Sequence, residues 1–495
     1  MNNLAQLITQ RAEKYPAHKY GMIGTSQTLS DLTKSAALIA ASLQELGLKS
    51  GSRVALIGIN HNSYLVAWTA LQFAGCQAAL INPSYPPELL AEMLLNLEPE
   101  AVIWVGVVPN TAVCSGVIHI DASQASDCLL QVNGCAIDIP REAISLPGLA
   151  RQHGDVAGFM HTSGTTGTPK FCAQSHEYFI RLGRFIADSL AFCEDDTVFA
   201  PLPLFHINPL GYGVVGALTG AAQFRSTEKF SASRFWQEVI GESVTALILH
   251  APPVEILKRA TTPADSKGHA VRIVFYADRE FLEDYQIPLG VSAYGSTEAG
   301  GLSHVWMWRR GDDANIPEGL SRYGGRGRHD IEWRVSAAGE IELRPVREHV
   351  MFEGYQCGRI LNNPFGKDGW FATGDLGRID EVGNLVFIER QAESIRVKGE
   401  FVPIGYVEDA FSKIDGIDDV AIWRRPSELV DDEITLYVVS NEVDLNKLGV
   451  VRSSLPSFMR PTSLVRVDQI PRDAGVGKIR RRQLGEARII EEYVL

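Results

Sequence analysis

The chain has 495 residues, of which 45% are hydrophobic and 21% charged, and its formal net charge is -13. This length predicts two to four folding units of roughly 150 residues each, and the composition is that of an ordinary soluble globular protein. The acidic balance argues against binding to nucleic acid, which needs basic surface, so we expect any bound nucleotide to be a small molecule in a local site.

The cysteines and the N-terminus indicate the compartment. Seven cysteines occur at irregular spacing without a Cys-x-x-Cys pair, which disfavours a disulfide framework or a zinc site. Leu4, Leu7 and Ile8 have helical spacing, and no basic segment followed by an apolar run precedes them. No apolar run is long enough to span a membrane. We therefore expect a cytoplasmic protein with no signal peptide and no membrane insertion.

Helical and strand patterns alternate through the first half of the chain. Ser30 is expected to cap a helix that runs to about Leu46, with Gly47 as its stop. The next elements are a buried strand at 54–57, a helix at 64–73 that ends at Gly75, and strands at 78–81 and 101–105. Strand, helix and strand at these lengths predict parallel βαβ units and an α/β fold.

The pattern changes after about residue 320. Residues 331–335 and 340–343 alternate apolar and polar side chains, which predicts half-exposed antiparallel strands. The last hundred residues mix short strands, such as 419–423 and 434–439, with helices, and they predict a small α+β domain.

The strongest functional signal is a stretch rich in glycine and threonine that ends in a lysine. It consists of Thr162, Ser163, Gly164, Thr165, Thr166, Gly167, Thr168, Pro169 and Lys170. The glycines let the backbone approach a ligand and point N–H groups at it, while the hydroxyls and the ammonium group add donors and positive charge. These features suit a polyphosphate. The stretch is not a Walker A loop, because the Gly-Lys-Ser/Thr ending is missing, and a surface loop without function is an alternative of equal weight on composition alone.

Five further segments follow this stretch in a defined order. They are P-L-F-H at 203–206, A-Y-G-S-T-E at 293–298, W-F-A-T-G-D at 370–375, I-E-R-Q at 388–391 and G-V-G-K-I-R at 475–480. Each motif alone is a weak signal, but the set resembles the adenylate-forming (AMP-binding) superfamily of acyl-CoA synthetases, peptide-synthetase adenylation domains and luciferases, over nearly the whole chain. A local match at 228–236, together with Phe275 and Tyr276, is similar to crotonobetaine/carnitine-CoA ligase-like members.

The resemblance implies the domain organisation. It predicts a large N-terminal domain over residues 1–391 and a small mobile C-terminal lid over 392–495. The active site is expected in the crevice between them, where domain interfaces tend to place ligands.

The resemblance also implies the residues that bind ATP and its magnesium ion. The cofactor-binding set is Thr162, Ser163, Gly164, Thr165, Thr166, Gly167, Tyr294, Gly295, Thr297, Asp375, Arg390 and Gly399; of these, Arg390 falls just before the expected hinge, and Gly399 belongs to the loop along which coenzyme A would enter. In this set Asp375 would hold the ribose diol, because a carboxylate accepts two hydrogen bonds from neighbouring hydroxyls. Glu298 would bind Mg²⁺, which prefers hard oxygen ligands. Without the resemblance, Asp375 is more often a turn residue, Glu298 is a solvated loop glutamate, and a core position is an equally good interpretation of Tyr294.

Three residues are assigned catalytic roles by the resemblance: Lys478, Lys170 and His206. An ammonium group on Lys478 would stabilise the charge that develops when a carboxylate attacks the α-phosphate. The alternative is a solvated basic face formed with residues 480–482. His206 would lie near the acyl carboxylate or the path of the thiol, although a lone histidine in an apolar run is more often a core residue.

Three segments depart from the family pattern. Phe275 to Asp278 replaces a glycine-rich segment that lies along adenine in many relatives, so the adenine contact must be built differently. Ala392 occupies a hinge position that is commonly charged, and Phe171 follows Lys170 where glycine is common.

Three functions fit these observations to different degrees. The first is an acyl-CoA ligase, in which an acid becomes acyl-AMP and coenzyme A then displaces AMP. The second is an enzyme that loads a free-standing carrier protein; Pro203 to Gly213 lacks the acidic residue that an amino-acid substrate would need. The third is a non-catalytic nucleotide-binding protein, which the presence of Lys478, Glu298 and Asp375 disfavours.

Overall fold

The computed structural model describes residues 2–107, 117–140, 142, 145–162, 169–312, 317, 320, 323–390, 395–426, 432–472 and 479–495. The chain divides into two compact units. Unit 1 comprises residues 1–83, 94–161 and 171–389, and unit 2 comprises residues 84–93, 162–170 and 390–495. The predicted domain boundary between 391 and 392 lies outside the described residues and stays a prediction.

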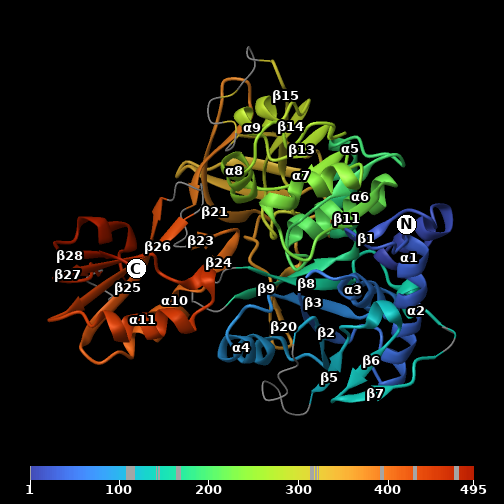
Figure 1. The fold of residues 1–495 in the computed structure, drawn as a ribbon, viewed down its shortest axis with the longest axis horizontal. Coiled ribbons are helices and arrows are strands. Elements are labelled where there is room, and N and C mark those ends of the chain that lie inside the picture. The colour runs from blue at the N-terminus through green and yellow to red at the C-terminus, as the bar shows by residue number, and fades with distance from the viewer. Residues whose placement is uncertain are drawn as a thin grey trace. The chain divides into compact units, whose positions relative to one another are not determined.

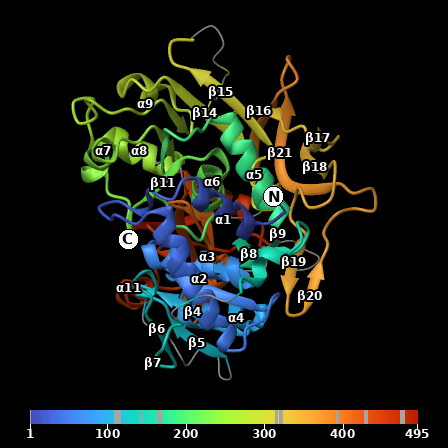
Figure 2. The ribbon, with the colours of Figure 1, turned by 90° about the vertical axis from the view of Figure 1, so that its right-hand side faces the viewer.

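Unit 1 is built on two large sheets. Within the described residues, the larger sheet has twelve strands in the order β1 (Tyr20–Met22), β11 (Gln223–Ser226), β10 (Thr197–Phe199), β12 (Ala246–Ile248), β13 (Ile273–Phe275), β14 (Leu289–Tyr294), β15 (His304–Arg309), β16 (Tyr323–Gly327), β22 (Leu385–Arg390), β21 (Phe371–Ile379), β18 (Glu340–Pro345) and β17 (Ile331–Val335). The pairs from β1 to β14 are parallel. The pairs β14–β15, β15–β16, β16–β22, β18–β21 and β17–β18 are antiparallel, and Figure 2 shows β16, β17, β18 and β21 together. The predicted antiparallel strands after residue 320 are therefore confirmed.

The second sheet contains the strands predicted in the first half of the chain. Its ten described strands have the order β20 (Ile360–Asn362), β19 (Gly354–Cys357), β9 (Lys170–Ser175), β8 (Val156–Thr162), β3 (Gln77–Ile81), β2 (Arg53–Gly58), β4 (Ala101–Val105), β5 (Ile118–Asp121), β6 (Leu130–Val132) and β7 (Cys135–Ile137). The strands from β8 to β5 are parallel. Every residue of β2 and β4 is buried, as expected for parallel strands covered on both faces.

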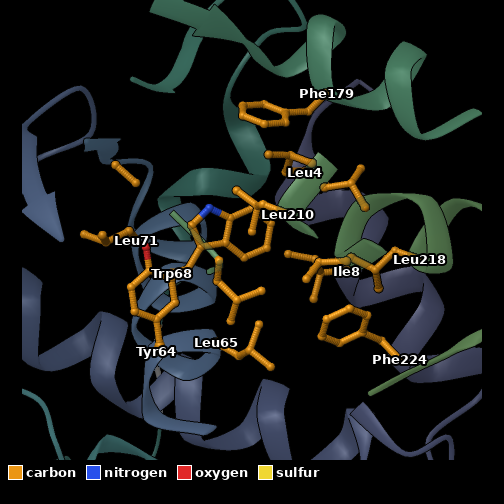
Figure 3. Close-up of a cluster of buried hydrophobic side chains, with 14 of the residues drawn as sticks. Leu4, Ile8, Tyr64, Leu65, Trp68, Leu71, Phe179, Leu210, Leu218 and Phe224 are labelled. Carbon is orange, nitrogen blue, oxygen red and sulfur yellow. The ribbon is translucent and has the colours of Figure 1, made fainter. Parts of the chain in front are cut away.

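Helices cover these sheets and form the core. They are α1 (Leu4–Lys14), α2 (Leu29–Glu45), α3 (Asn62–Ala74), α5 (His176–Ser189), a π-helix (Asn208–Val215) that continues into α6 (Gly216–Gly220), α7 (Ala232–Gly241), α8 (Ala251–Ala260) and α9 (Arg279–Asp284), with 3₁₀ turns at Ala125–Asp127 and Pro147–Ala150. A further helix, α4 (Pro87–Leu97), has residues in both units. Every residue of α3 after Asn62 is buried. Figure 3 shows Trp68 of α3 among side chains of α1 and the π-helix, including Ile8 and Leu210. Among the described residues, no helix combines the length and the apolarity that a membrane crossing requires.

The predicted start of α2 is wrong by two residues. Thr28, not Ser30, is the N-cap residue, and α2 ends at Glu45. The Thr28 hydroxyl accepts from the Asp31 N–H, and the Asp31 carboxylate accepts from the Thr28 N–H, which forms a capping box. Because this reciprocal pair satisfies two N–H groups, it outcompetes the single hydroxyl of Ser30.

Unit 2 contains a small α+β domain, as predicted for the last hundred residues. Its elements are the hairpin β23 (Ile395–Val397) and β24 (Glu400–Val402), α10 (Ile404–Ser412), β25 (Ile417–Pro426), β26 (Asp432–Ser440), α11 (Leu445–Ser454), β27 (Ser463–Val467) and β28 (Ile489–Val494), with 3₁₀ turns at Ser457–Met459 and Arg481–Glu486. The last four strands form one sheet in chain order, and Figure 1 shows α10 and α11 beside it. The predicted strands at 419–423 and 434–439 lie within β25 and β26.

Candidate active site

Two buried residues from distant segments meet at the end of β14. Tyr294 is the last residue of β14, and its hydroxyl donates a 2.8 Å hydrogen bond to Asp375 Oδ2 in β21. Asp375 is only 1% exposed and Tyr294 7%. The structure thus brings together two residues that the sequence analysis placed in one cofactor-binding set.

The pairing of β18 with β21 is irregular where Asp375 lies. The register shifts between Glu340 and Glu342, so that three residues of β21 lie opposite one residue of β18. Gly374, in this bulge, has φ +73°, and its N–H donates to Glu340 Oε1 at 2.8 Å. Bulges of this kind re-aim side chains next to functional sites, and this one accompanies the burial of an acidic side chain.

The loop after β14 carries Gly295, Thr297 and Glu298. A Cβ atom at Gly295 would lie 2.2 Å from the carbonyl oxygen of Gly301, so only glycine fits there. Thr297 and Glu298 are half-buried. The Tyr355 hydroxyl, from β19, donates to Glu298 Oε1 at 3.1 Å and so orients the carboxylate.

His206 lies in a turn that is fixed by a buried asparagine. Asn60, which is 6% exposed, accepts a 2.8 Å hydrogen bond from the Leu204 N–H through its side-chain oxygen. The His206 ring is half-buried, and its centroid lies 4.6 Å from Phe205 and 5.9 Å from His161. The π-helix that begins two residues later was not predicted; such helices often accompany functional sites.

The π-helix also supplies a side chain that contacts the segment after β14. The Tyr212 hydroxyl donates to the Gly301 carbonyl at 3.0 Å, and its ring centroid lies 5.1 Å from that of Phe275. Phe275 ends β13, and Tyr276 follows with φ +114° before Asp278 caps α9. Tyr276 therefore adopts a backbone conformation that favours glycine.

The remaining predicted residues of the site belong to unit 2. Thr162 ends β8 and is 8% exposed, and Lys170 is the half-buried first residue of β9. Residues 163–168, which include Ser163, Gly164, Thr165, Thr166 and Gly167, lie outside the described residues. Arg390 ends β22. Lys398 and Gly399 have φ +53° and +84° and join β23 to β24 as a two-residue hairpin turn, a conformation that favours glycine at the second position.

Lys478 also lies outside the described residues, but both ends of its segment are fixed. Arg472 and Ile479 form an antiparallel bridge, and the Arg480 N–H donates to the Pro471 carbonyl at 2.8 Å. In the adjoining basic run, the Arg481 side chain is 11% exposed and pairs with Glu408 at 2.9 Å. At least this arginine is therefore not part of a solvated basic face.

Sequence reasoning missed three side chains that contact the loop after β14. They are Tyr178 on α5, Tyr355 on β19 and Arg328 after β16. None lies in a recognisable motif, and each comes from an element far from residues 295–302 in the chain. Only the tertiary structure shows that they belong to one neighbourhood.

Comparison with known proteins gives consistent results over most of the chain. The model of the AMP-binding enzyme family matches residues 8–346. A crotonobetaine/carnitine–CoA ligase of Escherichia coli is 27% identical over 89% of this chain and 89% of its own. A medium/long-chain-fatty-acid–CoA ligase of Mycobacterium tuberculosis is 26% identical over 85% of this chain and 74% of its own.

A solved structure matches the fold. The o-succinylbenzoate CoA synthetase of Bacillus subtilis, bound to a product analogue, has a TM-score of 0.83 and 21% identity, with both chains fully covered. The same enzyme in complex with ATP and magnesium has a TM-score of 0.67 and 20% identity, over 98% of this chain and 99% of that chain. At this identity the likeness shows the fold, and it confirms the predicted α/β architecture with a large N-terminal and a small C-terminal part.

Proposed function

The chain belongs to the AMP-binding enzyme family, and on this premise we propose that it activates a carboxylic acid as acyl-AMP and transfers the acyl group to the thiol of coenzyme A. At the level of the family, the predicted superfamily and the predicted class of AMP-forming acid–thiol ligases are confirmed. The substrates and the roles of individual residues are proposals that rest on the geometry described above.

The observation that carries the proposal is the hydrogen bond between Tyr294 and Asp375. A carboxylate that is almost fully buried needs polar partners, and the tyrosine supplies one. In our proposal the Asp375 carboxylate accepts from a ribose hydroxyl, and the ring of Tyr294 packs against the base. Tyr294 and Asp375 also belong to two separate sequence motifs, which the resemblance assigns to the same nucleotide. This coincidence supports a binding role over a purely structural pair.

The first half-reaction joins the acid to AMP. A carboxylate oxygen of the acid attacks the α-phosphorus of ATP, a new acyl–phosphate bond forms, and the bond to pyrophosphate breaks. In our proposal Lys478 stabilises the charge that develops on the transferred group, and Lys170 with the hydroxyls of 162–166 binds the phosphates. Thr297 would contact the α-phosphate, and Arg390 would lie just before the hinge between the two domains.

Glu298 fits a magnesium ion only as one ligand among several. Among the described residues, no three His, Cys, Asp or Glu side chains cluster as a metal site. Mg²⁺ usually binds through one or two carboxylates together with substrate phosphates and water, and a single oriented glutamate suits that arrangement. The ion would offset the negative charge of the phosphates.

The second half-reaction releases AMP. The thiol sulfur attacks the acyl carbon, a thioester forms, and the bond to AMP breaks. We propose that His206 contacts the acyl carboxylate or the thiol path, and that the turn at Gly399 lies along the thiol's route. Relatives named CoA ligases support coenzyme A as the acceptor. A free-standing carrier protein is the alternative, and a non-catalytic nucleotide-binding protein is the second.

We expect pyrophosphate release from MgATP that depends on one class of carboxylic acid. The panel should include the acids in the names of the relatives, which are crotonobetaine or carnitine, fatty acids and o-succinylbenzoate, because these differ in size and charge. Each acid is tested with and without coenzyme A, and AMP formation should rise with coenzyme A. Acid-dependent release that coenzyme A does not accelerate would favour a carrier protein. If no acid of a broad panel caused pyrophosphate release, the result would contradict the ligase.

Restoring a charge at the predicted hinge should affect one half-reaction more than the other. Ala392→Asp is expected to change the rate of thioester formation from supplied acyl-AMP several-fold while pyrophosphate release changes less, because the rotation of the small domain is proposed to precede the second step. Single-turnover measurements of both steps test this. Unchanged rates in both would place the hinge elsewhere.

A further inference from the structure

The loop that carries Thr297 and Glu298 is held through its backbone carbonyl groups. Tyr178 of α5 donates to the carbonyl of Thr297 at 2.9 Å, and Tyr212 donates to that of Gly301 at 3.0 Å. The carbonyls of Gly300 and Leu302 both accept from Arg328, described next. Four carbonyl groups within six residues thus receive side-chain donors from three separate elements.

Arg328 contributes the largest share of these contacts. Its Nη1 donates to the carbonyls of Gly300 at 3.0 Å and Leu302 at 2.9 Å. Its Nε and Nη2 donate to the two carboxylate oxygens of Asp330 at 2.9 and 3.0 Å. The side chains of Arg328 and Asp330 are 1% and 4% exposed. The guanidinium group therefore donates from one edge to the Asp330 carboxylate and from another to the loop carbonyls.

A second arginine, Arg181, forms an ion pair with Asp330. Arg181 on α5 lies 3.5 Å from Asp330 and 2.5 Å from Glu177. The Arg328 guanidinium also lies 4.9 Å from the ring centroid of Phe185, on the same helix. Burial by itself would raise the pKa of Asp330, but the hydrogen bonds and charge of Arg328 hold it below its usual value, so the carboxylate stays ionised. Apolar side chains of similar size would avoid this buried charge, but they would leave the loop carbonyls without donors.

The loop needs such a restraint. Gly300 and Gly301 have φ +69° and +77°, and glycine pairs of this kind have many accessible conformations. Glu298, just before them, accepts one hydrogen bond from Tyr355, and its own carbonyl accepts from the Phe352 N–H at 3.3 Å. Glu298 therefore has two contacts of its own, and restraint of the glycine pair that follows limits how far its backbone can shift.

We propose that Arg328, oriented by Asp330, is a positioning residue that sets the Glu298 carboxylate for the metal–nucleotide complex. The proposal rests on the function proposed above, in which Glu298 binds the magnesium of MgATP. Arg328 touches neither nucleotide nor metal in this role. It fixes the backbone of residues 300–302, and through it the geometry of Glu298.

The main variant is Arg328→Lys, which keeps the charge but cannot serve both carbonyls and both carboxylate oxygens at once. We expect its affinity for MgATP to fall about tenfold, because a misplaced ligand weakens metal binding by roughly 10- to 100-fold. Its affinity for ATP in EDTA should change less than twofold. Calorimetric titrations of the full chain measure both, and Asp330→Asn should shift the same ratio in the same direction by a smaller factor.

The control is Arg225→Lys, a second buried arginine in unit 1. Its side chain is 0% exposed, and it donates to Glu242 at 2.9 Å and to the Thr25 carbonyl at 3.0 Å. Both lysine variants should lower the midpoint of thermal unfolding, but only Arg328→Lys should change the ratio of MgATP to ATP affinity. Equal ratios in the two variants would overturn the proposal.

A double variant distinguishes positioning of Glu298 by Arg328 from an effect of Arg328 on MgATP binding that does not involve Glu298. In a Glu298→Gln background, Arg328→Lys should cause little further loss of MgATP affinity; losses that multiply would overturn the proposal. Failure of the proposed function has a different signature. Wild-type protein without acid-dependent pyrophosphate release would contradict the ligase, while the titrations would still decide the role of Arg328.

Discussion

Replacing Lys478 by alanine is expected to lower the rate of acyl-AMP formation by about 10²–10³-fold, the usual loss when a group that stabilises transition-state charge is removed. The attacking carboxylate and the α-phosphate are both negative, so their approach concentrates charge that the ammonium group offsets. Stabilisation that is greater in the transition state than in the ground state appears in kcat, while the KM for ATP should change little.

The same variant should retain the second half-reaction. Thioester formation from supplied acyl-AMP and coenzyme A should stay within about threefold of the wild-type rate, because that step needs no charge on the α-phosphate to be neutralised. Pyrophosphate exchange and single-turnover thioester formation measure the two steps. Lys447→Ala, an exposed lysine on α11, is the control and should leave both unchanged. Equal loss in both steps would contradict the assigned role.

Replacing Asp375 by asparagine is expected to raise the KM for ATP about 10- to 100-fold, because hydrogen bonds to a charged acceptor contribute about 1.5–3 kcal/mol. Asparagine keeps the shape of the side chain and can still accept from Tyr294, so the loss reports mainly the interaction with the ribose hydroxyls. Steady-state kinetics at saturating acid give the KM. The effect should shrink markedly with a 2′,3′-dideoxyribose analogue of ATP, which lacks the contacts in question.

Two further variants delimit this result. Tyr294→Phe removes only the hydroxyl that contacts Asp375 and should raise the KM for ATP by a smaller factor. Asp368→Asn, at an exposed position before β21, should have no effect. A KM unchanged in Asp375→Asn would show that the carboxylate has a structural role only, and an equal loss with the dideoxy analogue would show that it does not contact the ribose.

The regular part of the fold follows from local patterns. The strands predicted at 54–57, 78–81 and 101–105 lie within β2, β3 and β4, because buried parallel strands produce short apolar runs between helices. The start of α2 was missed by two residues, because the capping box depends on a reciprocal bond that single-residue preferences do not reveal.

The site was only partly predictable. Motifs named Tyr294 and Asp375, but no local pattern showed that the two side chains meet or that Asp375 lies in a bulge of β21. Arg328 and Tyr355 act across the fold on a loop distant in sequence, so neither periodicity nor spacing could indicate them. The positive φ of Tyr276 was likewise hidden, because an aromatic residue gives no signal for such a backbone.

The fate of oxygen atoms tests the central claim most directly. When the carboxylate of the acid is labelled with ¹⁸O, attack on the α-phosphorus leaves one labelled oxygen in the acyl–phosphate bond. Breakage of the acyl–oxygen bond by the thiol then carries that oxygen into AMP. Mass spectrometry of the nucleotide products with the acid found in the panel should therefore show AMP with one ¹⁸O, alongside unlabelled pyrophosphate. Unlabelled AMP, or label in inorganic phosphate beside ADP, would contradict activation through an acyl adenylate.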